Sequence, residues 1–245
     1  MLIRTFRAGA ATLCAFLLLT AVILIAGPLF ILYSLLTGSA EEMNRMGVGA
    51  ASLALRLCGV RVRTEGLENI PAGVCLFVAN HVSNLDPPAV VCVIPRRVAL
   101  LAKKEVFRVP VLGTALRLAR FISVDRNDRG AAMASVELAK RNMREGMSYL
   151  VFPEGTRSPD GRLMRFKSGS IVLAIQTGVP IVPVSVIGTQ RLMARGKSLV
   201  LPGEVRVVFH PPITTQGSGI EKRHALTSRV RDVVCAALPP EQQPA

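Results

Sequence analysis

A stretch of 33 residues without a charged side chain, residues 8–40, is the feature that most restricts how this chain can fold. As one helix it would be about 50 Å long, whereas the hydrocarbon core of a bilayer is about 30 Å thick and is crossed by about 20 residues. Gly27 and Pro28 interrupt the run, and residues 8–26 alone are long enough to span. We therefore expect an N-terminal helical segment that associates with a membrane, and assign residues 1–58 to it.

Three arrangements of this segment are open. It can be a simple spanning anchor, a helix that bends at Gly27 and Pro28 and returns to the same face, or a signal peptide with Arg4 and Arg7 as its basic region. The apolar run is much longer than the roughly 7–15 residues of a signal peptide, which argues against cleavage. Residues 43–58 have the period of an amphipathic helix, which either packs on the core or lies on the lipid surface.

The basic surplus needs an anionic partner. Lysine and arginine number 30 against 16 aspartates and glutamates, a net charge of +14, which is typical of proteins that bind nucleic acid, an anionic membrane or a phosphorylated substrate. No helix-turn-helix, zinc-finger or RNA-binding pattern occurs and aromatic residues are only 4% of the chain, so nucleic acid is not expected as a partner. The five cysteines form no CxxC pair, and we predict neither a metal nor a cofactor.

From about residue 60 onward, short apolar runs alternate with stretches of helical period. We predict strands at 74–79, 121–124, 149–152, 181–186 and 205–210. One helix is predicted to begin at Asp86, and three others to cover residues 129–144, 168–177 and 221–237. The alternation indicates an α/β fold with a mixed, largely parallel sheet flanked by helices, which we assign to residues 59–245. Asp86 is expected to cap its helix, and the last residues, PPEQQPA, to fray.

Functional side chains in such sheets gather at the carboxyl ends of strands. His81 follows the first predicted strand, and Asp86 comes five residues later in the sequence NHVSNLD. A carboxylate that holds one imidazole nitrogen fixes the tautomer and leaves the other nitrogen as a base. The pair therefore fits an enzyme that takes a proton from an alcohol or water, although a helix cap and a surface histidine explain the same residues.

No enzyme nucleophile accompanies this pair in the sequence. A GxSxG motif is absent, and the P-loop-like end at Gly196 and Lys197 fails because position 191 is arginine. We therefore expect the base to activate the acceptor itself, with direct transfer rather than a covalent enzyme intermediate.

A second polar group, Glu154, Gly155, Thr156 and Arg157, follows the predicted strand at 149–152. Glycine lets the backbone approach a ligand closely, and arginine offers a rigid fork for a phosphate. A surface Glu–Arg pair in a turn is the alternative. Further cations that can enlarge this anion site are Lys103, Lys104, Arg126, Arg165 and Lys167.

Together these motifs resemble the glycerolipid acyltransferase family, in particular its 1-acyl-sn-glycerol-3-phosphate acyltransferases. NHVSNLD (80–86) fits the family's NHx4D motif, and FPEGTRS (152–158) matches its second signature position for position. LAKKEVFRVPVLG (101–113) and VPIVPV (179–184) resemble two further motifs, so that the resemblance covers roughly residues 60–215. The departure lies before Arg126, where Arg120 stands in the place of a usual glycine.

The resemblance implies transfer of a fatty acyl group from acyl-CoA or acyl carrier protein to the free hydroxyl of 1-acyl-sn-glycerol-3-phosphate, forming phosphatidic acid. It implies His81 as general base and Asp86 as the residue that orients it. A thiolate leaves readily, so the resemblance requires no metal. The residues implied to bind the glycerol-phosphate end are Arg126, Glu154, Gly155, Thr156 and Arg157, helped by Lys103 or Lys104.

Two questions stay open at this stage. Arg4 and Arg7 favour a cytoplasmic N-terminus, and a single span would then separate the catalytic domain from a cytosolic donor. We therefore expect a segment that re-enters or lies shallowly in the inner or cytoplasmic membrane, bent at Gly27 and Pro28, with the catalytic domain on the cytoplasmic side. The acceptor can also be another lyso-lipid, such as a lyso-ornithine lipid or a lysophospholipid. A non-catalytic basic membrane-binding protein would be expected to have lost the His81–Asp86 pair.

Overall fold

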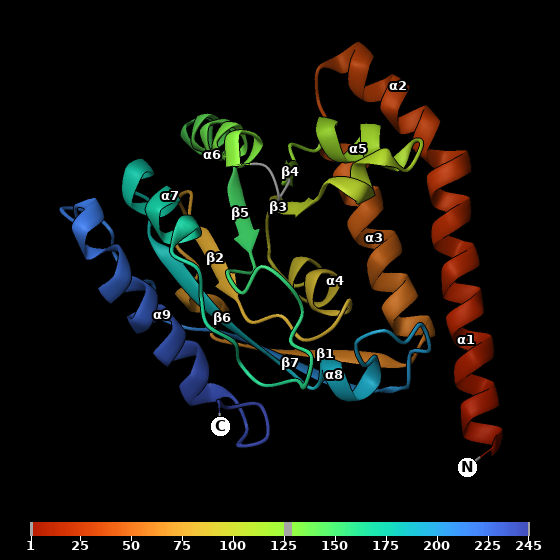
Figure 1. Cartoon of the computed structure of the whole chain (residues 1–245). Helices are drawn as coiled ribbons and strands as arrows, with labels where there is room; N and C mark the ends of the chain where they lie inside the picture. The colour runs from red at the N-terminus through yellow and green to blue at the C-terminus, as the bar shows by residue number, and fades with distance from the viewer. Residues whose placement is uncertain (1, 125–128, 245) are drawn as a thin grey trace.

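The computed structural model describes residues 2–124 and 129–244, which form one seven-stranded sheet with helices on both faces and long helices along one side (Figure 1). The strands are β1 (Val60–Glu65), β2 (Leu76–Ala79), β3 (Val98–Lys103), β4 (Ile122–Val124), β5 (Ser148–Val151), β6 (Ile181–Ile187) and β7 (Gly203–Phe209). The helices are α1 (Leu2–Ala21), α2 (Gly27–Thr37), α3 (Glu41–Leu57), α4 (Asp86–Val91), α5 (Leu112–Leu118), α6 (Arg129–Arg144), α7 (Gly169–Thr177), α8 (Thr189–Leu192) and α9 (Arg223–Ala237).

The sheet has the order β1-β7-β6-β2-β5-β3-β4. Strands β6, β2, β5, β3 and β4 run parallel to one another, whereas β7 pairs antiparallel with β6 and β1 lies parallel to β7. This confirms the predicted mixed, largely parallel sheet. Because β5, β2 and β6 are adjacent and parallel, the loops that follow them lie at the same edge of the sheet.

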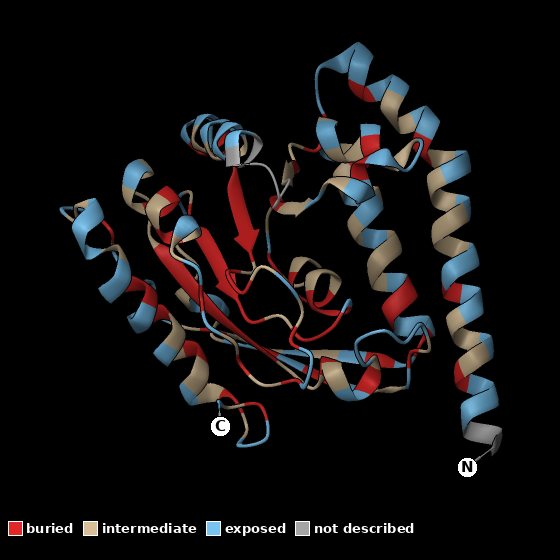
Figure 2. Cartoon of the chain, in the orientation of Figure 1, coloured by how far each residue is buried: buried red, intermediate tan, exposed pale blue. Residues whose placement is uncertain are grey.

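Strand β2 is the centre of the core. Its side chains alternate between the two faces: Phe77 packs in a cluster with residues of α3 and α4, and Leu76 and Val78 pack in a second cluster with residues of α6, α7 and α9. All of β2 is buried, as are β5 and most of β6 (Figure 2). The loop that leaves β2 therefore starts from the most rigid part of the molecule.

All five predicted strands are present, within two residues of the predicted ends, and the predicted helices correspond to α4, α6, α7 and α9. Two strands, β1 and β3, and two helices, α5 and α8, were not predicted. The expected fraying of the last residues is wrong. The backbone N–H of Leu163 donates to the carbonyl of Gln242 at 2.8 Å, and Arg191 forms an ion pair with Glu241.

The bend expected at Gly27 and Pro28 is present, but the chain does not turn back there, because it stays helical through these residues (Figure 1). A π-helical turn, Val22–Ala26, joins α1 to α2, and the Gly27 N–H donates to the Val22 carbonyl. Proline lacks an N–H and crowds the preceding turn, and a π-turn absorbs that misfit as a bend rather than a break. The chain reverses later, after the left-handed Gly38, and α3 returns alongside α1 (Figure 1).

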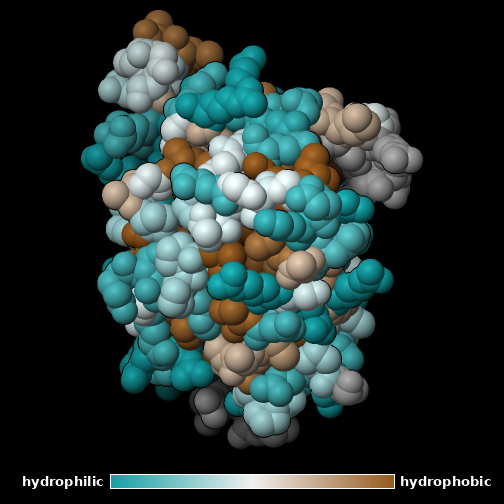
Figure 3. Space-filling model, turned by 90° about the vertical axis from the view of Figure 1, so that its left-hand side faces the viewer, coloured by the Kyte–Doolittle hydropathy of each residue, from teal (hydrophilic) through white to brown (hydrophobic). Residues whose placement is uncertain are grey.

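Helices α1 and α2 present apolar side chains to the outside. The helical stretch from Thr5 to Thr37 is long and apolar enough to cross a membrane, and only 11% of its most apolar window is buried. The face formed by α6, α7 and α9 is by contrast largely hydrophilic, with smaller hydrophobic areas in between (Figure 3). Side chains more than half exposed on α1, the π-turn and α2 are Phe6, Leu13, Phe16, Leu17, Leu24, Ile25, Leu29, Leu32, Leu35 and Leu36.

Helix α3 packs on the core, which is one of the two arrangements considered for residues 43–58. Met43, Ala54 and Leu55 are buried, and the helix contacts α4 and β1. Leu53 and Leu57 of the same helix are each 45% exposed. The helix therefore packs on the core along one side and continues the exposed apolar surface of α1 and α2 on another. The division at residue 58 stays a prediction.

Candidate active site

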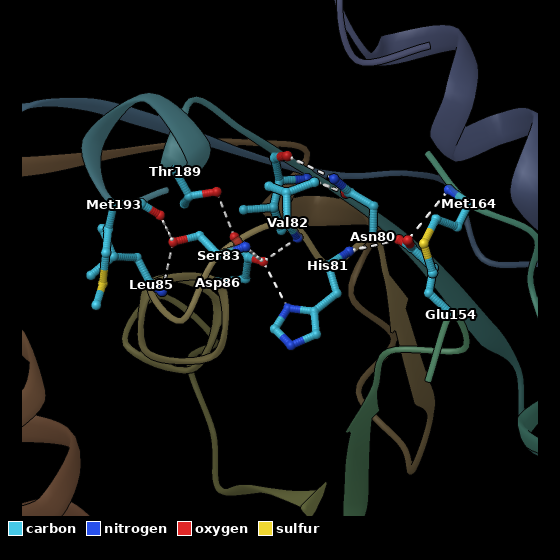
Figure 4. Close-up of polar contacts among 11 residues, drawn as sticks. Asn80, His81, Val82, Ser83, Leu85, Asp86, Glu154, Met164, Thr189 and Met193 are labelled. Atoms are coloured by element: carbon cyan, nitrogen blue, oxygen red, sulfur yellow. Dashed lines mark hydrogen bonds and ion pairs between the residues drawn. The ribbon is translucent and has the colours of Figure 1, made fainter. Parts of the chain in front are cut away.

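The loop between β2 and α4 brings His81 and Asp86 into direct contact. His81 Nδ1 lies 2.8 Å from Asp86 Oδ2, as the spacing predicts (Figure 4). Asn80 fixes the start of the loop, because its buried amide exchanges two hydrogen bonds with the backbone of Val186 on β6, at 2.8 and 2.9 Å. The pair is thus held on a tight turn at the carboxyl end of the central strand.

The Asp86 carboxylate is fully buried and accepts hydrogen bonds on both oxygens. The backbone N–H groups of Val82 and Ser83 each donate to Oδ2 at 2.7 Å, and Thr189 Oγ1 lies 2.5 Å from Oδ1. Asp86 begins α4 but does not cap it: Leu85 is the capping residue, and no side chain makes a cap hydrogen bond. The expected cap is therefore wrong, because the carboxylate turns back into the loop.

The His81 ring is positioned from both sides. It stacks on Phe152, with ring centroids 4.3 Å apart and planes at 28°, and its side chain is 16% exposed. An ionised Asp86 can only accept a hydrogen bond from His81, so Nδ1 carries the hydrogen and Nε2 is left as an acceptor. Nε2 points away from Asp86 (Figure 4), and His81 lines a cavity. This arrangement can remove a proton from a hydroxyl group placed in the cavity.

The position of Glu154 differs from the one expected for a residue that binds substrate. It is 2% exposed and does not line the cavity. Its Oε1 accepts the backbone N–H of His81 at 2.7 Å, and its Oε2 accepts that of Met164 at 3.3 Å. Burial raises the pKa of Glu154 to about 7, although the two backbone hydrogen bonds oppose the rise. In this structure the carboxylate holds the backbone of the histidine loop.

The cavity in front of His81 has a volume of about 460 Å³ and two chemically distinct parts. Lys103, Arg157, Lys167 and Arg195 supply cationic groups, and much of the remaining lining is apolar. Gly155 and Thr156 also line it, as predicted. Lys104 and Arg165 do not line it, and Arg126 lies outside the described residues. The apolar part of the lining includes Leu100, Leu101, Val124, Val136, Val151 and Leu173.

Gly155 allows a cation to lie against the loop. Its φ of +78° is in the left-handed region, and an added Cβ would lie 3.0 Å from the Lys167 amine. The Lys167 backbone N–H donates to the Pro153 carbonyl at 3.0 Å, which ties this cation to the loop after β5. The absence of a side chain at Gly155 therefore lets the Lys167 amine lie close to the backbone of this loop.

A second, apolar cavity of about 300 Å³ adjoins the first. It lies between the π-turn, α3, α4 and α5, and shares Pro87 and Leu100 with the cavity in front of His81. Met43 and Met46 of α3 are among its lining residues. Among the described residues, no three histidine, cysteine, aspartate or glutamate side chains are grouped as a metal would need.

Thr189 and Arg195 are two further residues of the site that no sequence motif indicated. Thr189 reaches the Asp86 carboxylate from the start of α8, just after β6, and Arg195 reaches the cavity from just beyond α8. The rule that led to His81, which looks for polar residues just after a parallel strand, applies equally to Thr189. It was overlooked because no neighbouring residue in the sequence suggested a partner for its hydroxyl.

Taken together, the geometry defines an α/β enzyme in which a histidine–aspartate pair acts beside a cationic loop. A family model described as Acyltransferase matches residues 61–187. The 1-acyl-sn-glycerol-3-phosphate acyltransferase of Limnanthes douglasii is 35% identical over 202 residues, which cover 82% of this chain and 72% of that protein. The chain therefore belongs to the acyltransferase family, as its motifs had suggested, in the group of the 1-acyl-sn-glycerol-3-phosphate acyltransferases.

Two further relatives agree with this placement. The alpha form of 1-acyl-sn-glycerol-3-phosphate acyltransferase from Homo sapiens is 34% identical over 177 residues, covering 71% of this chain and 62% of the human protein. The crystal structure of the 1-acyl-sn-glycerophosphate acyltransferase PlsC from Thermotoga maritima superposes with a TM-score of 0.79 at 30% identity, and the match covers 94% of both chains. The similarity thus includes the N-terminal helices as well as the sheet.

Proposed function

We propose that this protein transfers a fatty acyl group from a thioester to the free hydroxyl of 1-acyl-sn-glycerol-3-phosphate and so forms phosphatidic acid. The observation that carries the proposal is the His81–Asp86 pair, which lies at a cavity lined by both cationic and apolar residues. This is the combination that a phosphorylated lipid with a reactive hydroxyl needs. Relatives that cover most of this chain carry the same activity in their names.

His81 acts as the general base in this mechanism. Its Nε2 takes the hydroxyl proton as the acceptor oxygen attacks the thioester carbonyl, because a neutral alcohol is a poor nucleophile at neutral pH. Asp86 holds Nδ1 and stabilises the imidazolium that forms. The tetrahedral intermediate then expels the thiolate, which takes up a proton, and the new ester remains on the glycerol. No bond to the enzyme is formed, and no cofactor is needed beyond the acyl-CoA or acyl carrier protein that brings the acyl group.

The phosphate of the acceptor binds at the cationic side of the cavity. Lys103, Arg157 and the backbone of Gly155 and Thr156 are the proposed ligands, and the position of Lys167 adds it to them. Arg126 stays in the proposal on the strength of the family motif, whereas Lys104 has no cavity contact to support it. Glu154 is proposed as a support for the loop in place of its predicted contact with substrate, since both of its oxygens accept backbone hydrogen bonds.

The protein acts at a membrane in this proposal, as its exposed apolar helices suggest. We place it on the inner or cytoplasmic membrane, with the sheet on the cytoplasmic side, where acyl donors are made. The helices then lie in one leaflet instead of crossing both. Protease treatment of sealed right-side-out vesicles tests the side: residues 59–245 should survive, and digestion of this part would contradict the placement.

The activity is tested by acyl transfer in detergent micelles. Labelled acyl-CoA and acyl carrier protein are offered with lysophosphatidate, glycerol-3-phosphate, lysophosphatidylethanolamine and a lyso-ornithine lipid. Phosphatidate should form with the wild type and with His224→Ala, which alters an exposed histidine on α9, but not with His81→Ala. Turnover of another acceptor alone would identify that lipid as the substrate in place of lysophosphatidate, with the same mechanism. No turnover with any acceptor by folded protein would refute the proposal.

A further inference from the structure

Thr189 is a buried hydroxyl that the mechanism above does not use. It is the first residue of α8, which follows β6 after the left-handed Gly188, and it is fully buried. Although it is 103 residues from Asp86 in the sequence, its Oγ1 lies 2.5 Å from Asp86 Oδ1 (Figure 4). A hydroxyl this close to a carboxylate donates a hydrogen bond to it.

The four hydrogen bonds to Asp86 are divided unequally between its two oxygens. Oδ2 faces His81 Nδ1 and the backbone N–H groups of Val82 and Ser83, all of which belong to the same loop. Within the described part of the chain, Thr189 supplies the hydrogen bond at Oδ1. Thr189 therefore holds the second oxygen of the carboxylate from a different element, and together with the loop contacts to Oδ2 it opposes rotation about the Cβ–Cγ bond.

Helix α8 is itself held firmly against the histidine loop. Ser83 Oγ donates to the carbonyl of Met193 at 2.7 Å, so the loop and α8 are joined a second time. At Gly188, an added Cβ would lie 2.7 Å from the Glu204 carbonyl, which shows how closely the start of α8 packs on β7. The Thr189 hydroxyl thus comes from a fixed element and not from a mobile loop.

We infer that Thr189 is a positioning residue for the acyl transfer: it orients the Asp86 carboxylate so that Oδ2 meets His81 Nδ1 and Nε2 faces the cavity. This inference rests on the proposed function. A hydrogen bond to a charged group carries enough free energy that its loss should lower kcat about tenfold to a hundredfold. KM for lysophosphatidate should stay within about twofold, since no acceptor-binding group moves.

The test compares Thr189→Val, which removes the hydroxyl and keeps the shape, with Thr189→Ser, which keeps the hydroxyl. Thr215→Val is the matched control, because Thr215 is also buried and its hydroxyl donates to the Val179 carbonyl at 2.9 Å without lining the cavity. We expect kcat to fall in Thr189→Val, to be restored in Thr189→Ser, and to be unchanged in Thr215→Val. Circular dichroism and thermal melts establish that each variant is folded.

A kcat of Thr189→Val within about twofold of the wild type would overturn the inference, as would a loss of kcat that serine does not restore. If Thr189→Val does not fold, Thr189→Cys decides, since a thiol is a weaker donor and should give an intermediate kcat; a kcat equal to that of the wild type would again overturn the inference. These outcomes are distinct from failure of the proposed function, in which the wild type itself would not form phosphatidate.

Discussion

Replacing Glu154 with glutamine should remove a pH dependence of stability that the buried carboxylate creates. Burial raises the pKa of Glu154 to about 7 from its ordinary value of 4.5. The folded-state pKa is above the unfolded one, so the stability contributed by Glu154 is fully present below about pH 4.5 and is lost as the pH rises through about 7. At about 1.36 kcal/mol per pH unit, the full loss is roughly 3 kcal/mol.

Most of this change falls in an accessible range. Between about pH 5 and about pH 8, the free energy of unfolding should fall by about 2.5 kcal/mol more in the wild type than in Glu154→Gln. Glutamine leaves one of the two backbone N–H groups, of His81 or Met164, without its acceptor, and so lowers stability by an amount that does not depend on pH. The slope against pH is therefore the informative quantity, not the level at one pH.

The measurement is urea unfolding followed by far-ultraviolet circular dichroism in detergent, at several pH values, for both proteins. The difference between the two curves cancels the titration of all other groups. Glu68→Gln, a change at an exposed glutamate, serves as the control and should follow the wild type. Parallel curves for the wild type and Glu154→Gln, within about 0.5 kcal/mol over this range, would refute the reasoning.

Three further substitutions have definite expected outcomes. Gly155→Ala should raise KM for lysophosphatidate and destabilise the protein by about 1–2 kcal/mol, because the residue has positive φ and its Cβ would press on Lys167; steady-state kinetics and thermal melts measure both. Tyr149→Phe should cost about 1–2 kcal/mol in urea unfolding, since the buried hydroxyl donates to a backbone carbonyl at 2.8 Å. Gly66→Ala should prevent folding, as seen by loss of soluble protein in detergent, because its Cβ would overlap the Phe209 carbonyl. Wild-type behaviour of any one would contradict its explanation.

The central strands could be predicted from the sequence because burial on both faces leaves a continuous apolar run. Strand β3, VALLAK, was missed since alanine and leucine favour helices, and only its place between β5 and β4 makes it a strand. Strand β1 was missed because arginine alternates with valine in VRVRTE. That alternation is nevertheless typical of an edge strand with one solvent-exposed face. The π-turn before Pro28 has no sequence signal of its own that distinguishes a bend from a break.

The candidate site was predictable where residues are close in the sequence. The contact of His81 with Asp86 follows from a turn of five residues after a buried strand, and the loop from Gly155 to Arg157 lies beside it because β5 pairs with β2. The sequence could not tell in which direction the Glu154 carboxylate points, since a buried support and a cavity ligand need the same residue type. The contact of Thr189 depends on the pairing of β6 with β2, which sequence spacing does not reveal.

The pairing of β1 with β7 has a consequence for the order in which this chain becomes folded during synthesis. β1 (Val60–Glu65) leaves the ribosome directly after the apolar helices. Its partner, β7 (Gly203–Phe209), is translated almost 140 residues later. Throughout that interval the helices can already be in the lipid, while β1 has no partner strand. The alternating arginines of β1 protect the unpaired strand, because charged side chains on an open edge discourage pairing with other chains. The apolar helices are thus complete long before the sheet is closed, and the His81 loop gains its complete support only after β7 has been made.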